Sequence, residues 1–145
     1  MKFWKMNGAG NDFIIFNNMD AQLPIEQYCE ITREVCERHM SIGADGTMVV
    51  DKTKMPDADF KMTYINSDGT IGEMCGNGAR CICRYGYENG FSNEHQRIEV
   101  TSGIVSGERI DESNYKIRLT DVTTMLPDYP VVIDGNVYEN SYVEL

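Results

Sequence analysis

Helical periodicity is confined to two stretches of the 145-residue chain, and most of its other apolar residues fall in short strand-like runs. The two predicted helices are residues 25–39, opened by Pro24, and residues 77–88, closed by Asn89-Gly90. Helices do not alternate with strands along the chain. The sequence therefore predicts an α+β fold and argues against a doubly wound sheet.

The remaining segments predict a series of short strands joined by tight turns. The expected strands are residues 2–6, 13–18, 47–50, 60–66, 97–100, 103–110, 115–119, 131–133 and 137–145. A glycine-rich turn is expected over residues 7–12, another turn over 67–70, and a hairpin turn at Asp134-Gly135-Asn136. The second helix is apolar nearly all round, so we expect other elements to surround it.

The charge balance excludes several classes of partner. The chain has 13 Lys and Arg against 23 Asp and Glu, a formal net charge of −10. Such a field repels nucleic acid and anionic membrane surfaces, so neither is expected as a partner. The N-terminal residues include no apolar segment typical of a signal peptide, and no apolar run approaches the length of a membrane span. We expect a cytoplasmic protein.

The five cysteines do not form a recognised framework. Their number is odd, and no Cys-x-x-Cys pair occurs among Cys29, Cys36, Cys75, Cys81 and Cys83. A disulfide scaffold is therefore not expected, and a zinc site or a thioredoxin-like redox pair has little support. We expect no metal. Cys29 and Cys36, seven residues apart on one helical face, are expected to be buried as small apolar residues.

The segment from Glu73 to Cys81 is the densest candidate for chemistry. It places Cys75 where a turn meets the start of a predicted helix, and free N–H groups and the helix dipole favour a thiolate there. Gly76 and Gly78 leave the backbone open to a ligand, and successive N–H groups can bind an anion. Two interpretations stay open on these grounds: a reactive thiol beside a carboxylate site, or a buried cysteine before a tight helix start.

Three blocks in this order resemble the diaminopimelate epimerases. The blocks are KMNGAGNDF (5–13), RHMSIGADG (38–46), and NSDG (66–69) followed by MCGNGARC (74–81). The similarity runs from about residue 3 to residue 125. The resemblance implies a mostly antiparallel sheet rolled around a central helix, as one lobe of a two-lobe fold.

The resemblance also implies an activity and its residues. Members of this family invert one α-carbon of LL-diaminopimelate to give the meso form, without pyridoxal phosphate or another cofactor, in lysine and cell-wall precursor synthesis. Two cysteines on opposite faces of the substrate exchange the proton, and Cys75 matches one of them. Asn11, Asn66, Gly76 and Asn77 match substrate-binding positions. Family members often form dimers, so a homodimer is one assembly to test.

The chain departs from the family in three respects. Asn7 stands where the family usually has His, and Gly46 stands where some members direct a Gln toward the substrate. The chain is also about half the family's length, and the second cysteine belongs to the other lobe. We therefore expect residues 1–125 to form the N-terminal lobe and residues 126–145 to begin a second, truncated lobe, so that the chain alone is inactive.

Three other functions remain open at this point. The same scaffold suits racemisation of a different amino acid, because one thiol does not define the distal group of the substrate. A module that binds small anions without catalysis is the second alternative. A redox or zinc protein would instead contain bound metal or a titratable pair of thiols.

Overall fold

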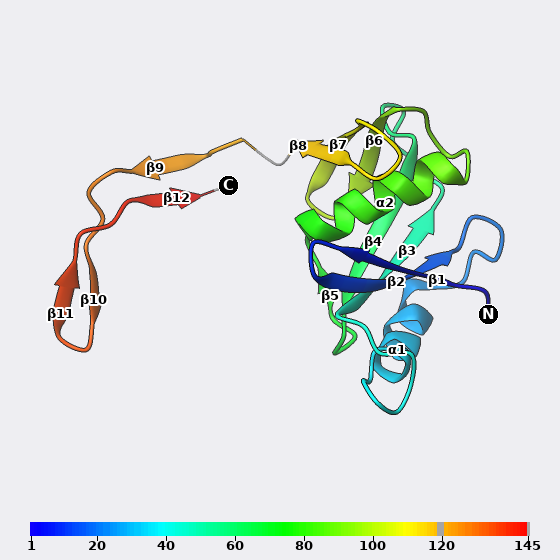
Figure 1. Cartoon of the computed structure of the whole chain (residues 1–145), viewed down its shortest axis with the longest axis horizontal. Helices are drawn as coiled ribbons and strands as arrows, with labels where there is room; N and C mark the ends of the chain where they lie inside the picture. Colours follow the sequence, from blue (N-terminus) through cyan, green and yellow to red (C-terminus); the bar gives the residue numbers. More distant parts are fainter. Residues whose placement is uncertain (119–120, 145) are drawn as a thin grey trace.

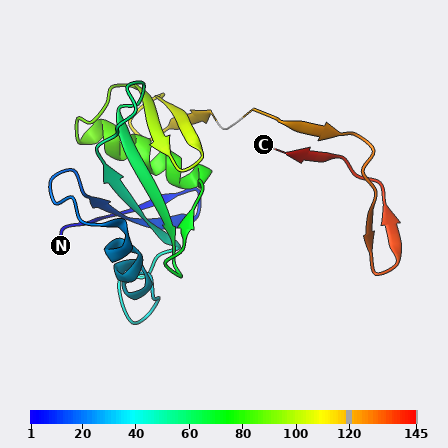
Figure 2. The same ribbon diagram turned by 180° about the vertical axis from the view of Figure 1, so that it is seen from behind.

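The computed structural model describes residues 1–118 and 121–144, and most of them form one curved mixed sheet with a helix on each face (Figure 1 and Figure 2). The strands of this sheet are β1 (Trp4–Gly8), β2 (Asn11–Asn17), β3 (Gly46–Asp51), β4 (Phe60–Asn66), β5 (Ile71–Gly72), β6 (His95–Val100), β7 (Gly103–Arg109) and β8 (Tyr115–Arg118). The helices are α1 (Ile25–Val35) and α2 (Gly76–Glu88).

The sheet curls around α2. Its strand order is β1-β2-β3-β4-β6-β7-β8, with β5 paired to β4. The pairs β2–β3 and β4–β6 are parallel, and the other neighbours in this sheet are antiparallel. Helix α2 packs against β1, β2, β7 and β8, so strands from both ends of the sheet meet on the same helix. The predicted α+β class and the mostly antiparallel sheet rolled around a central helix are confirmed.

Strand β2 lies between two hydrophobic clusters, one on each face of the sheet. Phe13 and Ile15 pack in the cluster around α2, whereas Ile14 and Phe16 pack in the cluster beside α1. All four side chains are buried. A strand covered on both faces needs a continuous apolar run instead of an alternating one, and this explains the Phe-Ile-Ile-Phe sequence.

Helix α2 is surrounded on most of its circumference. Seven of its residues are buried, including Ala79, Ile82 and Cys83 in the cluster between helix and sheet. Arg84 and Glu88 remain exposed and form an i,i+4 ion pair of 2.7 Å. The helix is therefore buried against the sheet but keeps one polar stripe toward the solvent.

Helix α1 ends four residues earlier than predicted. It begins after Pro24, which takes the N-cap position, and its last helical residue is Val35. Cys36 is the C-cap, and its side chain stays buried as predicted, but His39 has a left-handed φ of 72° and is exposed. The chain must turn here because the Gly43 N–H returns to bond the Val35 carbonyl at 2.9 Å. The extension of the helix to residue 39 was wrong.

Two hairpin turns are shorter than the sequence pattern indicated. The β1–β2 loop has only two residues, Ala9 and Gly10, both with positive φ, so the strands extend further into the predicted six-residue turn. The turns expected over residues 67–70 and at Asp134-Gly135 are present, the latter between β10 (Val131–Ile133) and β11 (Asn136–Tyr138). Asn136 belongs to the strand.

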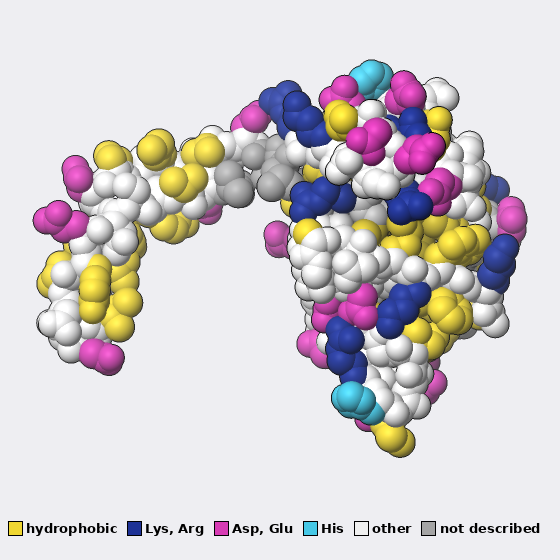
Figure 3. Space-filling model, in the orientation of Figure 1, with side chains coloured by type: hydrophobic (Ala, Val, Ile, Leu, Met, Phe, Trp, Pro, Cys, Tyr) yellow, Lys and Arg dark blue, Asp and Glu magenta, His cyan; other side chains and the backbone are white. Residues whose placement is uncertain are grey.

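Residues 121–144 form a pair of two-stranded ribbons that project from the main sheet (Figure 1). The strand predicted over 137–145 is broken, because β12 (Tyr142–Glu144) turns to pair with β9 (Thr124–Leu126), which the sequence did not predict. Residues 119 and 145 of the predicted strands lie outside the described residues. Many apolar side chains of these ribbons are exposed (Figure 3): Val122, Met125, Leu126, Tyr129, Val131, Val132, Ile133, Val137, Tyr138, Tyr142 and Val143.

Candidate active site

Cys75 is the N-cap residue of α2, and residues 73–75 connect this helix to the short strand β5. Its carbonyl accepts the Ala79 N–H at 2.7 Å, and its own side chain makes no capping hydrogen bond. The residue is partly buried and packs against the cluster around α2. The first N–H groups of a helix lack partners within the helix, so Gly76 and Asn77 offer main-chain donors beside the sulfur. The structure thus places the thiol at the turn-to-helix junction that the sequence predicts.

Two glycines allow α2 to approach the sheet closely at this end. A Cβ at Gly8 would lie 2.7 Å from the Asn77 carbonyl oxygen and 2.8 Å from the Cys81 sulfur. A Cβ at Gly78 would lie 3.1 Å from the Met48 sulfur. Because neither position has room for a side chain, the β1–β2 hairpin lies directly against the first turns of α2.

The close approach joins two of the predicted substrate-binding residues. The Asn77 side-chain amide donates to the Asn11 side-chain oxygen at 2.8 Å, although 66 positions separate them in the sequence. The Asn77 oxygen in turn accepts a hydrogen bond from Arg80. The first turn of α2 and the start of β2 therefore share one pair of amide side chains beside Cys75.

Asn66 lies at the end of β4 and is engaged with its own turn. Its side-chain amide donates to the Thr70 hydroxyl at 3.0 Å, and its N–H donates to the Thr70 carbonyl at 2.8 Å. Its partner in the β3–β4 register is Gly46, next to Asp45. The structure brings Asn11 and Asn77 together with Gly76 and Cys75, but no hydrogen bond in the described part of the chain links Asn66 to them.

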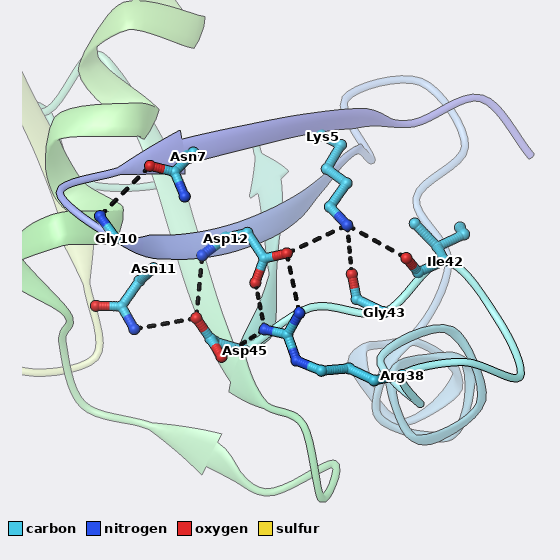
Figure 4. A network of polar contacts seen from close by, with 9 residues as sticks. All are labelled: Lys5, Asn7, Gly10, Asn11, Asp12, Arg38, Ile42, Gly43 and Asp45. Atoms are coloured by element: carbon cyan, nitrogen blue, oxygen red, sulfur yellow. Dashed lines mark hydrogen bonds and ion pairs between the residues drawn. The ribbon is translucent and has the colours of Figure 1, made fainter.

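Sequence reasoning missed a charged network on the other side of Asn11 (Figure 4). The Asn11 amide donates to one Asp45 oxygen at 3.0 Å, and the same oxygen accepts the Asp12 N–H at 3.0 Å. Arg38 bridges the two acids, at 2.6 Å from Asp12 and 2.9 Å from Asp45. Lys5 adds an ion pair of 3.2 Å to Asp12. Arg38 and Asp45 belong to the second block of the family resemblance, which was the available signal.

Hydrogen bonds to the ionised form keep both acids charged. The Arg38 guanidinium is the main reason that the pKa of Asp12 lies below its usual value. For Asp45, the hydrogen bond from the Asn11 amide is the largest cause of the lowered pKa, followed by the Asp12 N–H. Asp45 thus presents a fixed negative acceptor to Asn11.

Tyr64 is a second residue that the sequence did not single out. Its half-buried phenol has a pKa raised first by burial and then by the neighbouring Cys75. A Cβ at Gly46 would lie 2.9 Å from the Tyr64 hydroxyl oxygen, and one at Gly72 would lie 2.6 Å from a ring carbon. The Tyr64 ring therefore occupies the space beside Gly46, and a larger residue at 46 requires this ring to move.

The other four cysteines are wholly or partly buried. Burial raises the pKa of Cys36 and Cys81 to about 11 and that of Cys83 to about 12. Cys29 is only partly buried, so the prediction that it is buried like Cys36 was wrong, although burial still raises its pKa. All five cysteines are free thiols.

Asn7, at a position where the resemblance indicates His, stabilises the hairpin instead of contacting the charged network. Its side-chain oxygen accepts the Gly10 N–H at 3.4 Å (Figure 4). Within residues 1–118 and 121–144, no group of three or more His, Cys, Asp or Glu side chains is arranged to hold a metal ion. In the same residues, no helix has the length and apolar character needed to cross a membrane.

The curled sheet around a central helix is a fold that solved structures share. A probable proline racemase from Agrobacterium radiobacter K84 superimposes with a TM-score of 0.64 at 13% identity, over 91% of this chain and 45% of that protein. A PhzF-family protein from Bacillus anthracis gives a TM-score of 0.61 at 21% identity, over 81% of this chain and 40% of that protein. These likenesses define the class of fold.

Sequence comparison then gives the family. Residues 3–125 match the family described as diaminopimelate epimerase, and the chain belongs to this family. The diaminopimelate epimerase of Aquifex aeolicus (strain VF5) is 36% identical over 93% of this chain and 50% of its own length. That of Caldanaerobacter subterraneus subsp. tengcongensis is 37% identical over 100% of this chain and 57% of its own length. The chain spans about half the length of the curated relatives it matches.

Proposed function

We propose that this chain forms one lobe of an amino-acid epimerase and supplies one of the two thiols that exchange a proton with the α-carbon of the substrate. The observation that supports this most directly is the position of Cys75, at the start of α2 and beside the Asn11–Asn77 amide pair. We further propose LL-diaminopimelate as the substrate and meso-diaminopimelate as the product, in keeping with the family.

The proposed reaction uses groups that this chain places together. The Cys75 thiolate takes the α-proton on one face of the substrate, and a thiol on the opposite face donates a proton to the α-carbon. The stereocentre is inverted while one proton is gained and one is lost. The N–H groups at the start of α2 bind the α-carboxylate and stabilise the negative charge that develops on deprotonation. No cofactor or metal takes part in this proposal.

The second thiol comes from outside this chain in our proposal. Cys81 lies six residues after Cys75, about 9 Å further along the helix axis, and its sulfur lies against Gly8. Cys83 is buried in the middle of the helix. Neither sulfur can face Cys75 across a substrate carbon. We accordingly propose that residues 1–125 are the first lobe, that 126–145 begin the second, and that the isolated chain is inactive.

The free thiols also support a reducing compartment, so we propose a cytoplasmic location and a place in lysine and cell-wall precursor synthesis. The partners proposed are a small amino-acid substrate, the second lobe and, as an assembly to test, a second copy in a homodimer. Nucleic acid and membranes are not proposed as partners.

The decisive experiment joins this chain to the second half of the Aquifex aeolicus relative, here called the two-lobe protein. Epimerisation of LL-diaminopimelate in deuterated water should place one deuterium on the α-carbon of the product. Cys75→Ala should abolish this reaction, and Cys29→Ala serves as the matched control. Product formation by the isolated 145-residue chain would contradict the proposal that the second thiol is external.

A related racemase activity is the second candidate, favoured by the solved neighbours named as a probable proline racemase and a hydroxyproline epimerase. Competition between diaminopimelate stereoisomers and simple amino acids such as proline separates the two. Inhibition by proline at concentrations similar to those of diaminopimelate would favour the racemase. A folded two-lobe protein that binds substrate but has no activity to lose on Cys75→Ala would favour the binding module.

A further inference from the structure

We infer that Asp45 and Arg80 are positioning residues that fix the direction of the Asn11 and Asn77 side-chain amides, and so determine which amide atoms face the substrate. The inference rests on the proposed function for its consequence, because it treats Asn11 and Asn77 as substrate-binding residues. It extends that proposal to two residues that lie one contact further away.

The hydrogen bonds form a chain with a defined direction. Asn11 donates to Asp45 at 3.0 Å, Asn77 donates to Asn11 at 2.8 Å, and Arg80 donates to Asn77. Each asparagine therefore donates toward Asp45 and accepts from the direction of Arg80. All three contacts are between side chains that are partly buried.

The two ends of this chain determine its direction. A carboxylate can only accept hydrogen bonds, and a guanidinium can only donate them. A carboxamide has one accepting side and one donating side, and a flip of the group exchanges the two. With Asp45 at one end and Arg80 at the other, the arrangement satisfies every contact in one direction only. Reversing either amide would place an NH₂ group against a donor or an oxygen against a carboxylate.

Asp45 is itself held in place from two other sides. Its second oxygen accepts from Arg38 at 2.9 Å, and its first oxygen also accepts the Asp12 N–H at 3.0 Å. The backbone on both sides of Asp45 is fixed as well, because the Asp45 N–H donates to the Asp12 carbonyl at 2.9 Å and Gly46 begins β3. The carboxylate is thus a rigid reference point for Asn11 (Figure 4).

The fixed direction leaves predictable atoms free. Each amide retains one N–H and one lone pair that the chain of contacts does not use, and both asparagines are partly exposed, so we infer that a ligand can reach these atoms. A substrate amino acid then meets a preset arrangement of donors and acceptors and need not reorient two freely rotating amides. Preorganisation of this kind strengthens binding mainly by reducing the entropy lost on association.

The first test measures the amides directly in the 145-residue chain. The side-chain NH₂ signals of Asn11 and Asn77 should be resolved by NMR and should exchange slowly with water. Asp45→Asn should speed the exchange of the Asn11 amide protons by about tenfold, because the charged acceptor is lost. Arg80→Gln should loosen Asn77 in the same way, while Arg80→Lys, which keeps a donor-only end, should restore slow exchange.

Matched controls change the same residue types outside the network. Arg84→Gln alters the same helix one turn further on, where the arginine pairs only with exposed Glu88 among the described contacts. Asp57→Asn removes an exposed carboxylate. Neither control should alter the Asn11 or Asn77 signals. Unchanged amide exchange in both Asp45→Asn and Arg80→Gln would overturn the inference.

The second test follows substrate affinity in the two-lobe protein. Asp45→Asn and Arg80→Gln should each raise KM by about tenfold with little change in kcat, the pattern of lost uniform binding. Arg80→Lys should restore KM, which a role in overall stability alone would not require. Loosened amides with unchanged KM would refute the positioning role. If the unsubstituted two-lobe protein has no activity, the proposed function fails, while the NMR result still decides whether Asp45 and Arg80 fix the amides.

Discussion

The first turn of α2 and the middle of the same helix both contain cysteine, but they place the sulfur in opposite surroundings. Cys75 caps the helix at a partly open, polar edge beside Asn77. Cys81 and Cys83 lie within the core, and burial raises their pKa to about 11 and about 12. About two helical turns therefore separate a partly exposed thiol at the start of α2 from two buried thiols that act as small apolar side chains.

The difference shows that the surroundings of a cysteine depend on its place in the fold and not on residue type alone. The Gly-Asn-Gly sequence after Cys75 opens the backbone, and the β1–β2 hairpin brings a second amide to it. Around Cys83, by contrast, the sheet closes on the helix so tightly that a Cβ at Gly107 would overlap its sulfur. The same helix thus borders the proposed site at one end and packs into the core further along.

The largest expected effect is on the epimerisation rate and tests Cys75 at the start of α2. Cys75→Ser in the two-lobe protein should lower the epimerisation rate by at least about a hundredfold, because a hydroxyl is a much weaker acid and base catalyst than a thiol at neutral pH. Its thermal unfolding should change little, since the residue caps a partly exposed turn. Cys29→Ser should retain activity, and substantial activity in Cys75→Ser would remove the proposed role of this sulfur.

A smaller effect concerns the order in which the thiols react. At pH 8, a thiol with a pKa of about 11 is ionised to about one part in a thousand, so Cys81 and Cys36 should resist alkylation. Cys83 should resist it further. Timed treatment with iodoacetamide followed by peptide mass spectrometry should find Cys75 modified first. Modification of Cys83 before Cys75 in the folded chain would contradict the expected order of reactivity.

The tight packing around Cys83 can be tested by measuring the free energy of unfolding. Gly107→Ala should lower the free energy of unfolding by about 2 kcal/mol, because its new methyl group meets the Cys83 sulfur and approaches Ile117. Urea denaturation measures the change. Cys83→Ala should relieve part of it, so the double variant should be more stable than the sum of the two single changes predicts. Strict additivity would show that the two positions do not compete for space.

The smallest expected effect is the pH dependence of stability that comes from Asp12 and Asp45, the acids next to Asn11. Asp12 and Asp45 have folded-state pKa values below the ordinary 3.8, so they bind protons more weakly in the folded chain. Their contribution to stability is present above pH 3.8 and is lost as the pH falls through the lowered values. Asp45→Asn should cost under about 1 kcal/mol at pH 6, and this difference should shrink toward pH 2. Urea denaturation from pH 6 to pH 2 measures it, and a difference that grows on acidification would contradict this account.

Much of the fold could be predicted from local pattern, because its signals lie within a few residues. Periodicity indicated both helices and most strands of the main sheet, and the Cys75 junction followed from a turn next to a helix start. Strand β9 was missed because its short apolar segment pairs with β12, 16 positions away at the nearest pair, Leu126 and Tyr142. Helix α1 was predicted too long because its end depends on the return of Gly43 to Val35.

The polar network shows where sequence reasoning reaches its limit. Asn11 and Asn77 were selected separately, but their direct hydrogen bond depends on how the hairpin meets α2. Asp45 carries no local sign of its contact with Asn11, since 34 positions separate them. Asn66 was selected with them and instead bonds its own turn. These contacts depend on how segments far apart in the sequence pack together, and this packing cannot be predicted from local patterns in a single sequence.

The apolar core of β2, Phe-Ile-Ile-Phe, is a palindrome, and this has a consequence for strand alignment. A slip of one position would exchange the two faces yet still present one Phe and one Ile to each side, so hydrophobicity discriminates poorly between alignments. Polar groups at the strand's ends must supply the discrimination: Asp12 with its cationic partners before it, and Asn18 after it, whose buried amide is bonded to Leu23 and Asp51. The ion pairs of Asp12 therefore help to fix the alignment of β2 and, with it, the position of the neighbouring Asn11.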